Sequence, residues 1–440
     1  MKKRICLVLL LLLVALALIG CSEHILTTRE GLEPTCAADG YSSYKKCICF
    51  WCDYKEDFEI LPAKEHSFEA VEAKLATPYE NGHTAYEECS VCHFTRGYEE
   101  TFYAYPVCER LPDAKDRPFV RDLSAAERSE LAHIYNALMR FDEDYTLTQE
   151  LTISDVERLM EYLNLIFPEL IHCANGYSYL YSEDIVSRIT FEYTMDRQEY
   201  ADAMETINER VSTVLAATQD MSEPRREIYV HDYIINTCDY EIDADHSGDA
   251  YGALVLGKAK CDGYAKAFSL LMMSMGAECY TVSGSTDEGP HAWNVVLVDG
   301  EYYNVDVTWD DEEAKGAMYA YFNISDEIFD KTHLTDEYYE ALVPECNSIL
   351  LSVPYIDGTH IKADEDVAIR LSRIAAIESR KEEIDVHIRV DTAEQFEYLE
   401  KNINRFFEAY LESRNQRFRF LTYTYKDAGY IRFVVDIIDE

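Results

Sequence analysis

The chain has 440 residues, which is long for one hydrophobic core and predicts two or three domains. Its composition is globular, with 48% hydrophobic residues and 34 tyrosines. The 83 acidic residues outnumber the 40 basic ones and give a formal net charge of −43. This charge argues against nucleic acid as a partner, because phosphate binding needs a surface rich in lysine and arginine.

The amino terminus has the pattern of a secretion signal. Basic residues 2–4 precede an apolar stretch from Ile5 to Ile19, which is too short for a comfortable membrane span. The stretch ends in Leu18-Ile19-Gly20-Cys21, which resembles the lipobox of bacterial lipoproteins. The resemblance implies that residues 1–21 are a lipoprotein signal, that Cys21 is lipidated, and that the protein is extracytoplasmic and anchored to the bacterial cell membrane. An ordinary secretory signal and an uncleaved anchor helix are the alternatives.

Residues 22–112 are rich in cysteine and contain an internal repeat, since residues 40–47 match residues 82–89 at an offset of 42. Short repeated units cannot bury a sufficient core alone and need cross-links. The sequence leaves open whether zinc ions or disulfides supply these cross-links. We expect two zinc-ribbon-like modules with a structural or adhesive role. The candidate ligand sets are His24 or Cys36 with Cys49 and Cys52, and His66 with Cys89, Cys92 and Cys108.

Helical patterns dominate residues 120–225. Ser124 and Glu127 have the spacing of a capping box, and apolar residues follow at helical intervals. Further helices are expected from Ile153 to about Phe167 and from Arg197 to Gln219, with a strand-like stretch over residues 187–195 between them. We interpret this region as a helical preamble to the domain that follows.

Cys261 begins an amphipathic helix that ends at Gly276. The positive end of a helix dipole lowers a thiol pKa and favours the nucleophilic thiolate. A buried structural cysteine is the competing interpretation. The other cysteines outside the repeat, Cys173, Cys238, Cys279 and Cys346, carry no motif; we expect core thiols, although Cys238 and Cys279 are also compatible with a bridge.

A predicted hairpin supplies two further side chains. Strands from His291 to Val298 and from Glu301 to Thr308 flank the turn Asp299-Gly300. With a two-residue loop, His291 and Asp306 are diagonal neighbours on one sheet face. A loop of three residues with a bulge would place them on opposite faces. Each residue alone has an ordinary structural explanation, but their succession favours a Cys-His-Asp triad.

Five segments within residues 229–330 resemble the transglutaminase-like family found in bacterial secreted proteins. The resemblance implies a papain-like fold in which Cys261 is the nucleophile, His291 the general base and acid, and Asp306 the orienting carboxylate. With the preamble it covers roughly residues 120–340. Tyr251 is a candidate for holding an oxyanion. The matching segments are Val230-His231-Asp232-Tyr233, Ala250-Tyr251-Gly252-Ala253-Leu254, Cys261-Asp262-Gly263-Tyr264-Ala265, His291-Ala292-Trp293-Asn294 and Asp306-Val307-Thr308-Trp309.

The carboxyl-terminal residues 355–440 predict a small α+β domain. Helices are expected around residues 363–380 and from Thr392 to Arg414, and strands from Ile384 to Val390, Arg417 to Tyr425 and Tyr430 to Ile438. No catalytic pattern is present there, so we expect a packing or partner-binding role.

The predicted fold class is therefore α+β: a papain-like transglutaminase core with a helical preamble, Cys-rich modules and a carboxyl-terminal unit. The predicted function is that of a cell-surface lipoprotein, a cysteine protease or transglutaminase-type acyltransferase that acts on protein or cell-wall peptide amides through a thioacyl intermediate. No cofactor is expected for catalysis. The alternative is a non-enzymatic surface module for peptide binding or adhesion.

Overall fold

The structure is a computed structural model that describes residues 24–36, 38–48, 54–74, 82–98, 100–101, 117, 119–120, 123–173, 176–311, 316–336, 339, 342–414 and 416–438. Among these residues no helix is both long enough and apolar enough to cross a membrane. The expected signal segment 1–21 with Cys21, and the cysteines Cys49, Cys52 and Cys108, lie outside the described residues. The chain divides into one unit of residues 1–77 and 81–102 and a second unit of residues 78–80 and 103–440.

The first unit contains two copies of one strand arrangement. In the first copy a three-stranded antiparallel sheet has the order β1-β3-β4 and β2 pairs with β5; in the second copy the orders are β6-β8-β9 and β7 with β10. The 42-residue repeat thus produces two modules with the same strand pairing. The strands are β1 (Leu26–Arg29), β2 (Gly40–Tyr41), β3 (Tyr44–Cys47), β4 (Lys55–Glu56), β5 (Ile60–Leu61), β6 (Phe68–Val71), β7 (Gly82–His83), β8 (Tyr86–Cys89), β9 (Thr95–Arg96) and β10 (Glu100–Thr101).

The grouping of cysteines in this unit differs from the prediction. Cys36, which the spacing grouped with Cys49 and Cys52, lies beside Cys89 with 3.6 Å between the Sγ atoms. The physical reason is that the loop carrying Cys36 is hydrogen-bonded to residues 63–64, in the linker between the two modules. Cys36 therefore belongs with the cysteines of the second module.

The second unit begins with helices, as predicted, and the capping box of Ser124 and Glu127 is confirmed. Two of its three strands were not predicted, because β11 and β12 are mostly exposed or half-buried and lack a strong apolar alternation. Together with β13 they form an antiparallel sheet in the order β11-β13-β12. The elements are α2 (Ala125–Met139), β11 (Asp144–Thr152), α3 (Ile153–Ile166), β12 (Tyr177–Ser182), β13 (Ile185–Phe191), α4 (Arg197–Thr218) and α5 (Glu223–Thr237).

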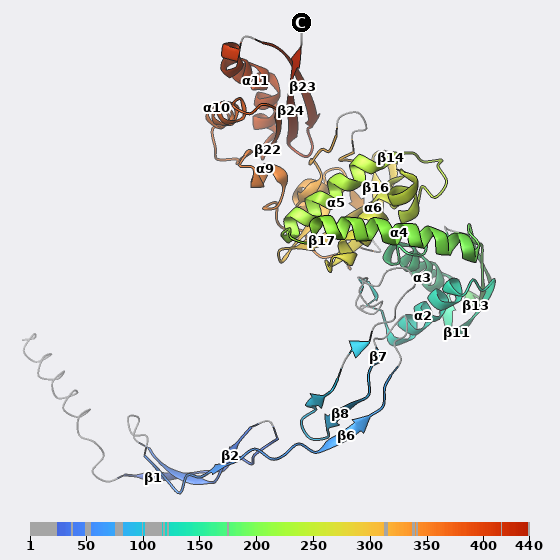
Figure 1. Ribbon diagram of the computed structural model, residues 1–440, viewed down its shortest axis with the longest axis vertical. Coiled ribbons are helices and arrows are strands. Elements are labelled where there is room, and N and C mark those ends of the chain that lie inside the picture. Colours follow the sequence, from blue (N-terminus) through green and yellow to red (C-terminus); the bar gives the residue numbers. More distant parts are fainter. Residues whose placement is uncertain are drawn as a thin grey trace, which may run out of the picture. The chain divides into compact units, whose positions relative to one another are not determined.

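A five-stranded antiparallel sheet in the order β19-β18-β17-β16-β20 follows. Helix α6 (Cys261–Ser274) packs on β16 and β17 and is also contacted by α4 and α5 (Figure 1). One hydrophobic core joins the preamble to this sheet. The remaining elements are β14 (Asp239–Tyr240), a π-helical turn (Gly252–Leu256), β15 (Lys258–Ala259), β16 (Cys279–Thr286), β17 (Gly289–Val298), β18 (Glu301–Val305), β19 (Phe322–Ile324), α7 (Asp326–Phe329), β20 (Leu334–Thr335) and α9 (Val353–Ile356).

The carboxyl-terminal elements form a four-stranded sheet, in the order β21-β22-β24-β23, with a hydrophobic core of its own. The three strands predicted here are confirmed to the residue. The predicted second helix is also confirmed, since Thr392 caps it and a 3₁₀ turn (Glu412–Arg414) extends it. The elements are β21 (His360–Ile361), α10 (Val367–Glu378), β22 (Ile384–Val390), α11 (Ala393–Leu411), β23 (Arg417–Tyr425) and β24 (Tyr430–Ile438).

A buried arginine fastens these elements to the segment before β19. Arg389 on β22 is 1% exposed, and its Nη2 donates to the carbonyl oxygens of Tyr319 (3.2 Å) and Ala320 (2.8 Å). Its Nη1 donates to the carbonyl oxygen of Ala428. The hydroxyl of Tyr430 accepts a hydrogen bond from the N–H of Tyr319 at 3.0 Å. The loop that leads into β19 is thereby held by the last sheet of the chain.

We predict that Arg389→Met lowers the free energy of unfolding by about 2–4 kcal/mol, because it leaves two buried carbonyl groups and one partly buried carbonyl group without their donors. Arg419→Met is the matched control, since Arg419 pairs with Asp436 on the exposed side of β23 and its loss costs at most about 1 kcal/mol. Urea unfolding followed by circular dichroism measures both values. Equal losses in the two variants would contradict the anchoring role of Arg389.

Candidate active site

Cys261 is the first residue of α6 and is 8% exposed. A loop packs tightly against the start of this helix: the N–H of Lys260 donates to the carbonyl oxygen of Ser247 at 2.9 Å. The approach requires a glycine two residues after the cysteine, because a Cβ on Gly263 would lie 2.5 Å from that same oxygen and 2.7 Å from the Cβ of Ala259. The Cys261-Asp262-Gly263 sequence therefore places Cys261 at the start of the helix and also permits the close packing of the loop.

The buried lysine of α6 connects the helix to the preamble. Lys266 donates from Nζ to the side-chain oxygen of Asn164 on α3 (2.7 Å) and to the carbonyl oxygen of Gly248 (2.9 Å). Burial lowers the pKa of this ammonium group. The preamble thus helps to fix the helix that carries Cys261.

The hairpin of β17 and β18 has the predicted register, with Val298 opposite Glu301. The returning strand is shorter than predicted, because it ends at Val305 and not at Thr308. Asp306 ends it: its Oδ1 accepts hydrogen bonds from the N–H groups of Thr308 (3.0 Å) and Trp309 (3.1 Å), which folds the next residues into a turn.

His291 and Asp306 are in direct contact, as the register predicted. Nε2 of His291 lies 2.7 Å from Oδ2 of Asp306, which leaves Nδ1 as the nitrogen available to Cys261. Cys261 packs with Ala265 and with Ala292, the neighbour of His291. All three residues are buried, and Cys261 is close enough to His291 to raise its pKa, so the structure places the cysteine near the His291–Asp306 pair.

The electrostatics of the cluster favour a charged imidazole. Burial lowers the pKa of His291, but the charge and hydrogen bond of Asp306, together with a hydrogen bond to Cys261, outweigh burial and raise this pKa to about 10. Burial alone would raise the pKa of Asp306. The charge of His291 and the hydrogen bonds from His291 and His333 instead bring the Asp306 pKa well below its usual range. A positive charge therefore lies beside the sulfur at neutral pH.

His333 is a site residue that was not predicted from the sequence. Its Nε2 lies 3.1 Å from Oδ2 of Asp306, and its Nδ1 lies 2.9 Å from the hydroxyl of Thr332. Its ring stacks on Phe329 with a centroid distance of 3.8 Å. No local pattern marks it, because the contact is made only when β20 pairs with β16. That pairing needs a glycine at position 284, where a Cβ would lie 2.3 Å from the carbonyl oxygen of Leu334.

The two histidines and Asp306 also form a set of potential metal ligands. The distances fit hydrogen bonds better than metal coordination. Two ligand atoms on a tetrahedral ion are about 3.4 Å apart when both bonds are near 2.1 Å. The His291–Asp306 distance of 2.7 Å is shorter and matches a charge-assisted N–H···O hydrogen bond. His291 and Asp306 thus fit a hydrogen-bonded imidazole–carboxylate pair better than two ligands of one metal ion.

The His231-Asp232 motif is connected to Asp306 through a chain of hydrogen bonds. Nε2 of His231 is 3.3 Å from Oδ2 of Asp310, and Nδ1 is 3.0 Å from Oδ1 of Asp232. Burial lowers the pKa of His231, but the two carboxylates outweigh it and raise the pKa to about 9. Asp310 in turn accepts from the N–H of Tyr321, whose carbonyl oxygen accepts from the N–H of Asp306. His231 and Asp232 therefore help to hold Asp306 in position.

Two tyrosines near the head of α6 differ in environment. The ring of Tyr251, the predicted oxyanion candidate, packs edge-on against His246 at 5.4 Å. Tyr240 is 40% exposed, and its pKa is raised first by partial burial and next by the charge of Cys261. Tyr240 is therefore partly exposed to solvent and within electrostatic range of Cys261.

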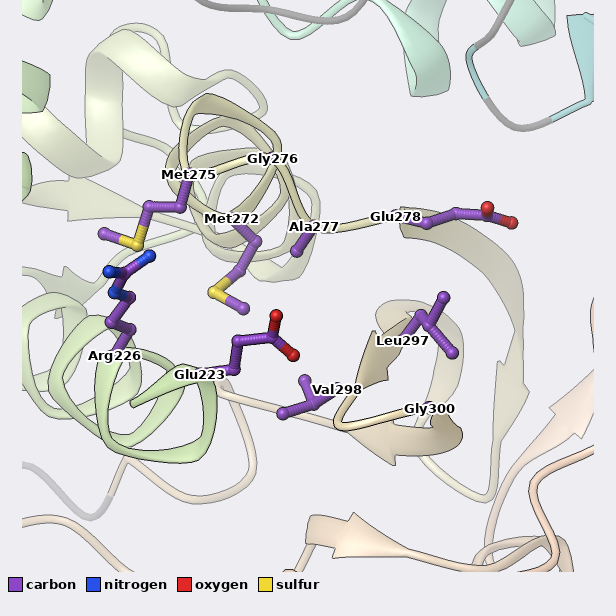
Figure 2. A pocket seen from close by; sticks show the side chains of 10 residues that line it. All are labelled: Glu223, Arg226, Met272, Met275, Gly276, Ala277, Glu278, Leu297, Val298 and Gly300. Carbon is purple, nitrogen blue, oxygen red and sulfur yellow. The ribbon is translucent and has the colours of Figure 1, made fainter. Parts of the chain in front are cut away.

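A cavity of about 260 Å³ lies at the other end of α6 (Figure 2). Met272 and Met275 line it together with Glu223 and Arg226 of α5. Met272 is eleven residues after Cys261, which corresponds to about 16 Å along the helix. This cavity is therefore separate from the candidate active site.

The other described cysteines of the second unit are free thiols, as expected: Cys173, Cys238, Cys279 and Cys346. Burial raises the pKa of Cys173 and of Cys238 to about 12, and it also raises those of Cys279 and Cys346. Cys238 and Cys279 form no bridge. These thiols stay protonated at neutral pH and are poor nucleophiles.

Comparisons with known proteins agree with this architecture. Residues 209–307 match the sequence model of the Transglutaminase-like superfamily. Over 120 residues the chain is 30% identical to the kyphoscoliosis peptidases of Mus musculus and Homo sapiens, which covers 23% of this chain and only 18% of each relative. A solved structure described as a TGase is similar at 14% identity with a TM-score of 0.24, covering 51% of this chain and 57% of that one.

We predict that Asp306→Asn lowers the free energy of unfolding at pH 7 by about 2–4 kcal/mol, because the carboxylate holds four hydrogen bonds without exposure to water. The folded pKa of Asp306 is depressed, so this stability is complete above the unfolded pKa of about 3.9 and is lost as the pH falls further. Urea unfolding at pH 7 and at pH 3 measures the difference.

Asp220→Asn is the matched control for this measurement, because Asp220 is exposed. The difference in free energy of unfolding between Asp306→Asn and wild type should be smaller at pH 3 than at pH 7. The control should have the wild-type free energy of unfolding at both pH values. A gap that is independent of pH would contradict the depressed pKa of Asp306.

Proposed function

We propose that this chain, which contains a transglutaminase-like superfamily domain over residues 209–307, is a thiol enzyme that acts on peptide or protein amides. Cys261 is the nucleophile, His291 the general acid and base, and Asp306 the carboxylate that orients the imidazole. The observation that carries the proposal is the buried His291–Asp306 pair, whose imidazole is influenced by a cysteine at the head of a helix.

The proposed reaction has two steps. The Cys261 thiolate attacks the amide carbonyl carbon, a C–S bond forms, and the C–N bond breaks as protonated His291 gives its proton to the leaving amine. In the second step neutral His291 removes a proton from water or from an acceptor amine. That nucleophile displaces the sulfur, which leaves as thiolate, and His291 is protonated again.

The head of α6 also offers donors for the oxyanion that forms during attack. The N–H groups of Cys261 and Asp262 lie in the first turn, where helix geometry gives them no acceptor within the helix. The hydroxyl of Tyr240, which is within electrostatic range of Cys261, is a further candidate donor. Together they would stabilise negative charge on the substrate oxygen.

Hydrolysis is the favoured outcome of the second step. The curated relatives to which part of this chain is similar carry the name peptidase. Acyl transfer to an amine remains the second outcome, since both reactions share the thioacyl intermediate. We further propose that lipidated Cys21 anchors the chain outside the cytoplasm at the bacterial cell membrane, where protein or cell-wall peptide is the substrate.

We predict that iodoacetamide alkylates Cys261 at pH 7 roughly tenfold more slowly in His291→Gln than in wild type, because the variant lacks the charge beside the sulfur. The His291 pKa is about 10, so this charge is present below that pH and is lost above it. The difference in alkylation rate between wild type and His291→Gln should therefore become smaller as the pH rises above about 10. Peptide mapping by mass spectrometry reports the alkylation of Cys261 separately from the other thiols.

His133→Gln is the control for this experiment, because His133 is exposed on α2 and lies outside the site. It should react as wild type does. Equal alkylation rates in all three proteins at pH 7 would count against the enzyme and in favour of a surface module that only binds peptide.

We also predict that incubation with a peptide library leaves an acyl group on Cys261 that mass spectrometry detects, and that Cys261→Ala abolishes it. Added primary amine separates the two reactions: peptide acids show hydrolysis, and peptide–amine conjugates show transfer. The absence of any acyl adduct and of any product would exclude both.

A further inference from the structure

Three cysteines and one histidine of the first unit converge on a single point. The side-chain atoms of Cys36, His66, Cys89 and Cys92 that can bind a metal all lie within 4.8 Å of one another. Cys89 is fully buried and Cys36 is 8% exposed. Such a cluster lies outside the candidate active site and has no part in the proposed reaction.

The four residues come from three separate segments of the chain. Cys89 is the last residue of β8, and Cys92 lies in the turn that follows it. His66 precedes β6, and its ring stacks on Phe94 with a centroid distance of 4.9 Å. Cys36 lies in the loop between β1 and β2 of the first module.

The linker between the modules brings the Cys36 loop to the other three residues. The N–H of Lys64 donates to the carbonyl oxygen of Thr35 at 3.0 Å, next to Cys36. The N–H of Ala63 donates to Oδ1 of Asp39 at 2.7 Å. The linker therefore runs along the loop immediately before it reaches His66.

The distances match a tetrahedral thiolate–imidazole site and not a disulfide. With Zn–S and Zn–N bonds of about 2.3 and 2.05 Å, two sulfurs are about 3.8 Å apart and a sulfur and a nitrogen about 3.6 Å apart. The Sγ atoms of Cys36 and Cys89 are 3.6 Å apart, and Sγ of Cys92 is 3.3 Å from Nδ1 of His66. A disulfide would need about 2.05 Å between sulfurs.

We propose that Cys36, Cys89 and Cys92 through Sγ, and His66 through Nδ1, bind one zinc ion that joins the two modules. Three ligands come from the second repeat and one from the first, so the ion is a cross-link between repeats. A Cys₃His set with four protein ligands is closed and typical of structural zinc. The repeat position of Cys36 in the second module is Pro78, so this ligand is not duplicated.

The test is the zinc content of the full-length chain, purified in detergent under reducing conditions without chelator. Wild type should contain about one equivalent of zinc more than Cys36→Ser. Cys173→Ser is the matched control, because it removes a half-buried thiol from the second unit and should keep the wild-type zinc content. Equal zinc contents in wild type and Cys36→Ser would overturn the proposal.

A second variant keeps the test decisive if Cys36→Ser fails to fold. His66→Cys replaces one zinc ligand by another and should retain the metal. After exchange to Co²⁺, its thiolate-to-cobalt absorption should exceed that of wild type, because a fourth sulfur then coordinates the ion. An unchanged absorption would remove His66 from the site.

The oxidation state of the thiols provides the remaining check. Alkylation of the denatured chain with and without prior reduction distinguishes free or metal-bound thiols from a disulfide. We expect Cys36 and Cys89 to be alkylated without reduction once zinc has been removed. A Cys36–Cys89 disulfide in protein prepared without added oxidant would overturn the zinc assignment.

Discussion

The carboxylate of Asp306 is the group on which the candidate active site depends. A buried charge is costly unless it is fully hydrogen-bonded, and four donors satisfy this one: two imidazoles at Oδ2 and two backbone N–H groups at Oδ1. The donors come from β17, from the turn after β18 and from the segment before β20. One side chain therefore fixes the histidine ring, ends a strand and holds the last strand of the sheet in place.

The positions of Cys261 and His333 depend on close packing of the backbone. Gly263 lets the loop that contains Ser247 lie against the first turn of α6, and Gly284 lets β20 approach β16. The first contact positions Cys261 and the second delivers His333. In both places the glycine is needed because another chain segment occupies the space of a side chain.

The sequence predicted most reliably what is encoded locally. The strands Ile384–Val390, Arg417–Tyr425 and Tyr430–Ile438 were predicted to the residue, because periodicity and turn residues bound them on both sides. The hairpin register placed His291 beside Asp306 for the same reason. Features that depend on contacts between distant segments were missed: His333 is 27 residues from Asp306, and Cys36 is 53 residues from Cys89. Neither pair leaves a signal in a short window of sequence.

The hydrogen bonds of Arg389 carry a consequence for the extent of the functional unit. The match to the superfamily ends at residue 307, yet the N–H of Asp306 donates to Tyr321, and the preceding Tyr319 and Ala320 are held by β22. The last sheet of the chain therefore supports the segment that holds Asp306. A fragment trimmed to the family signature would lose that support, so the smallest piece able to keep Asp306 in place extends well past the signature and includes the final sheet.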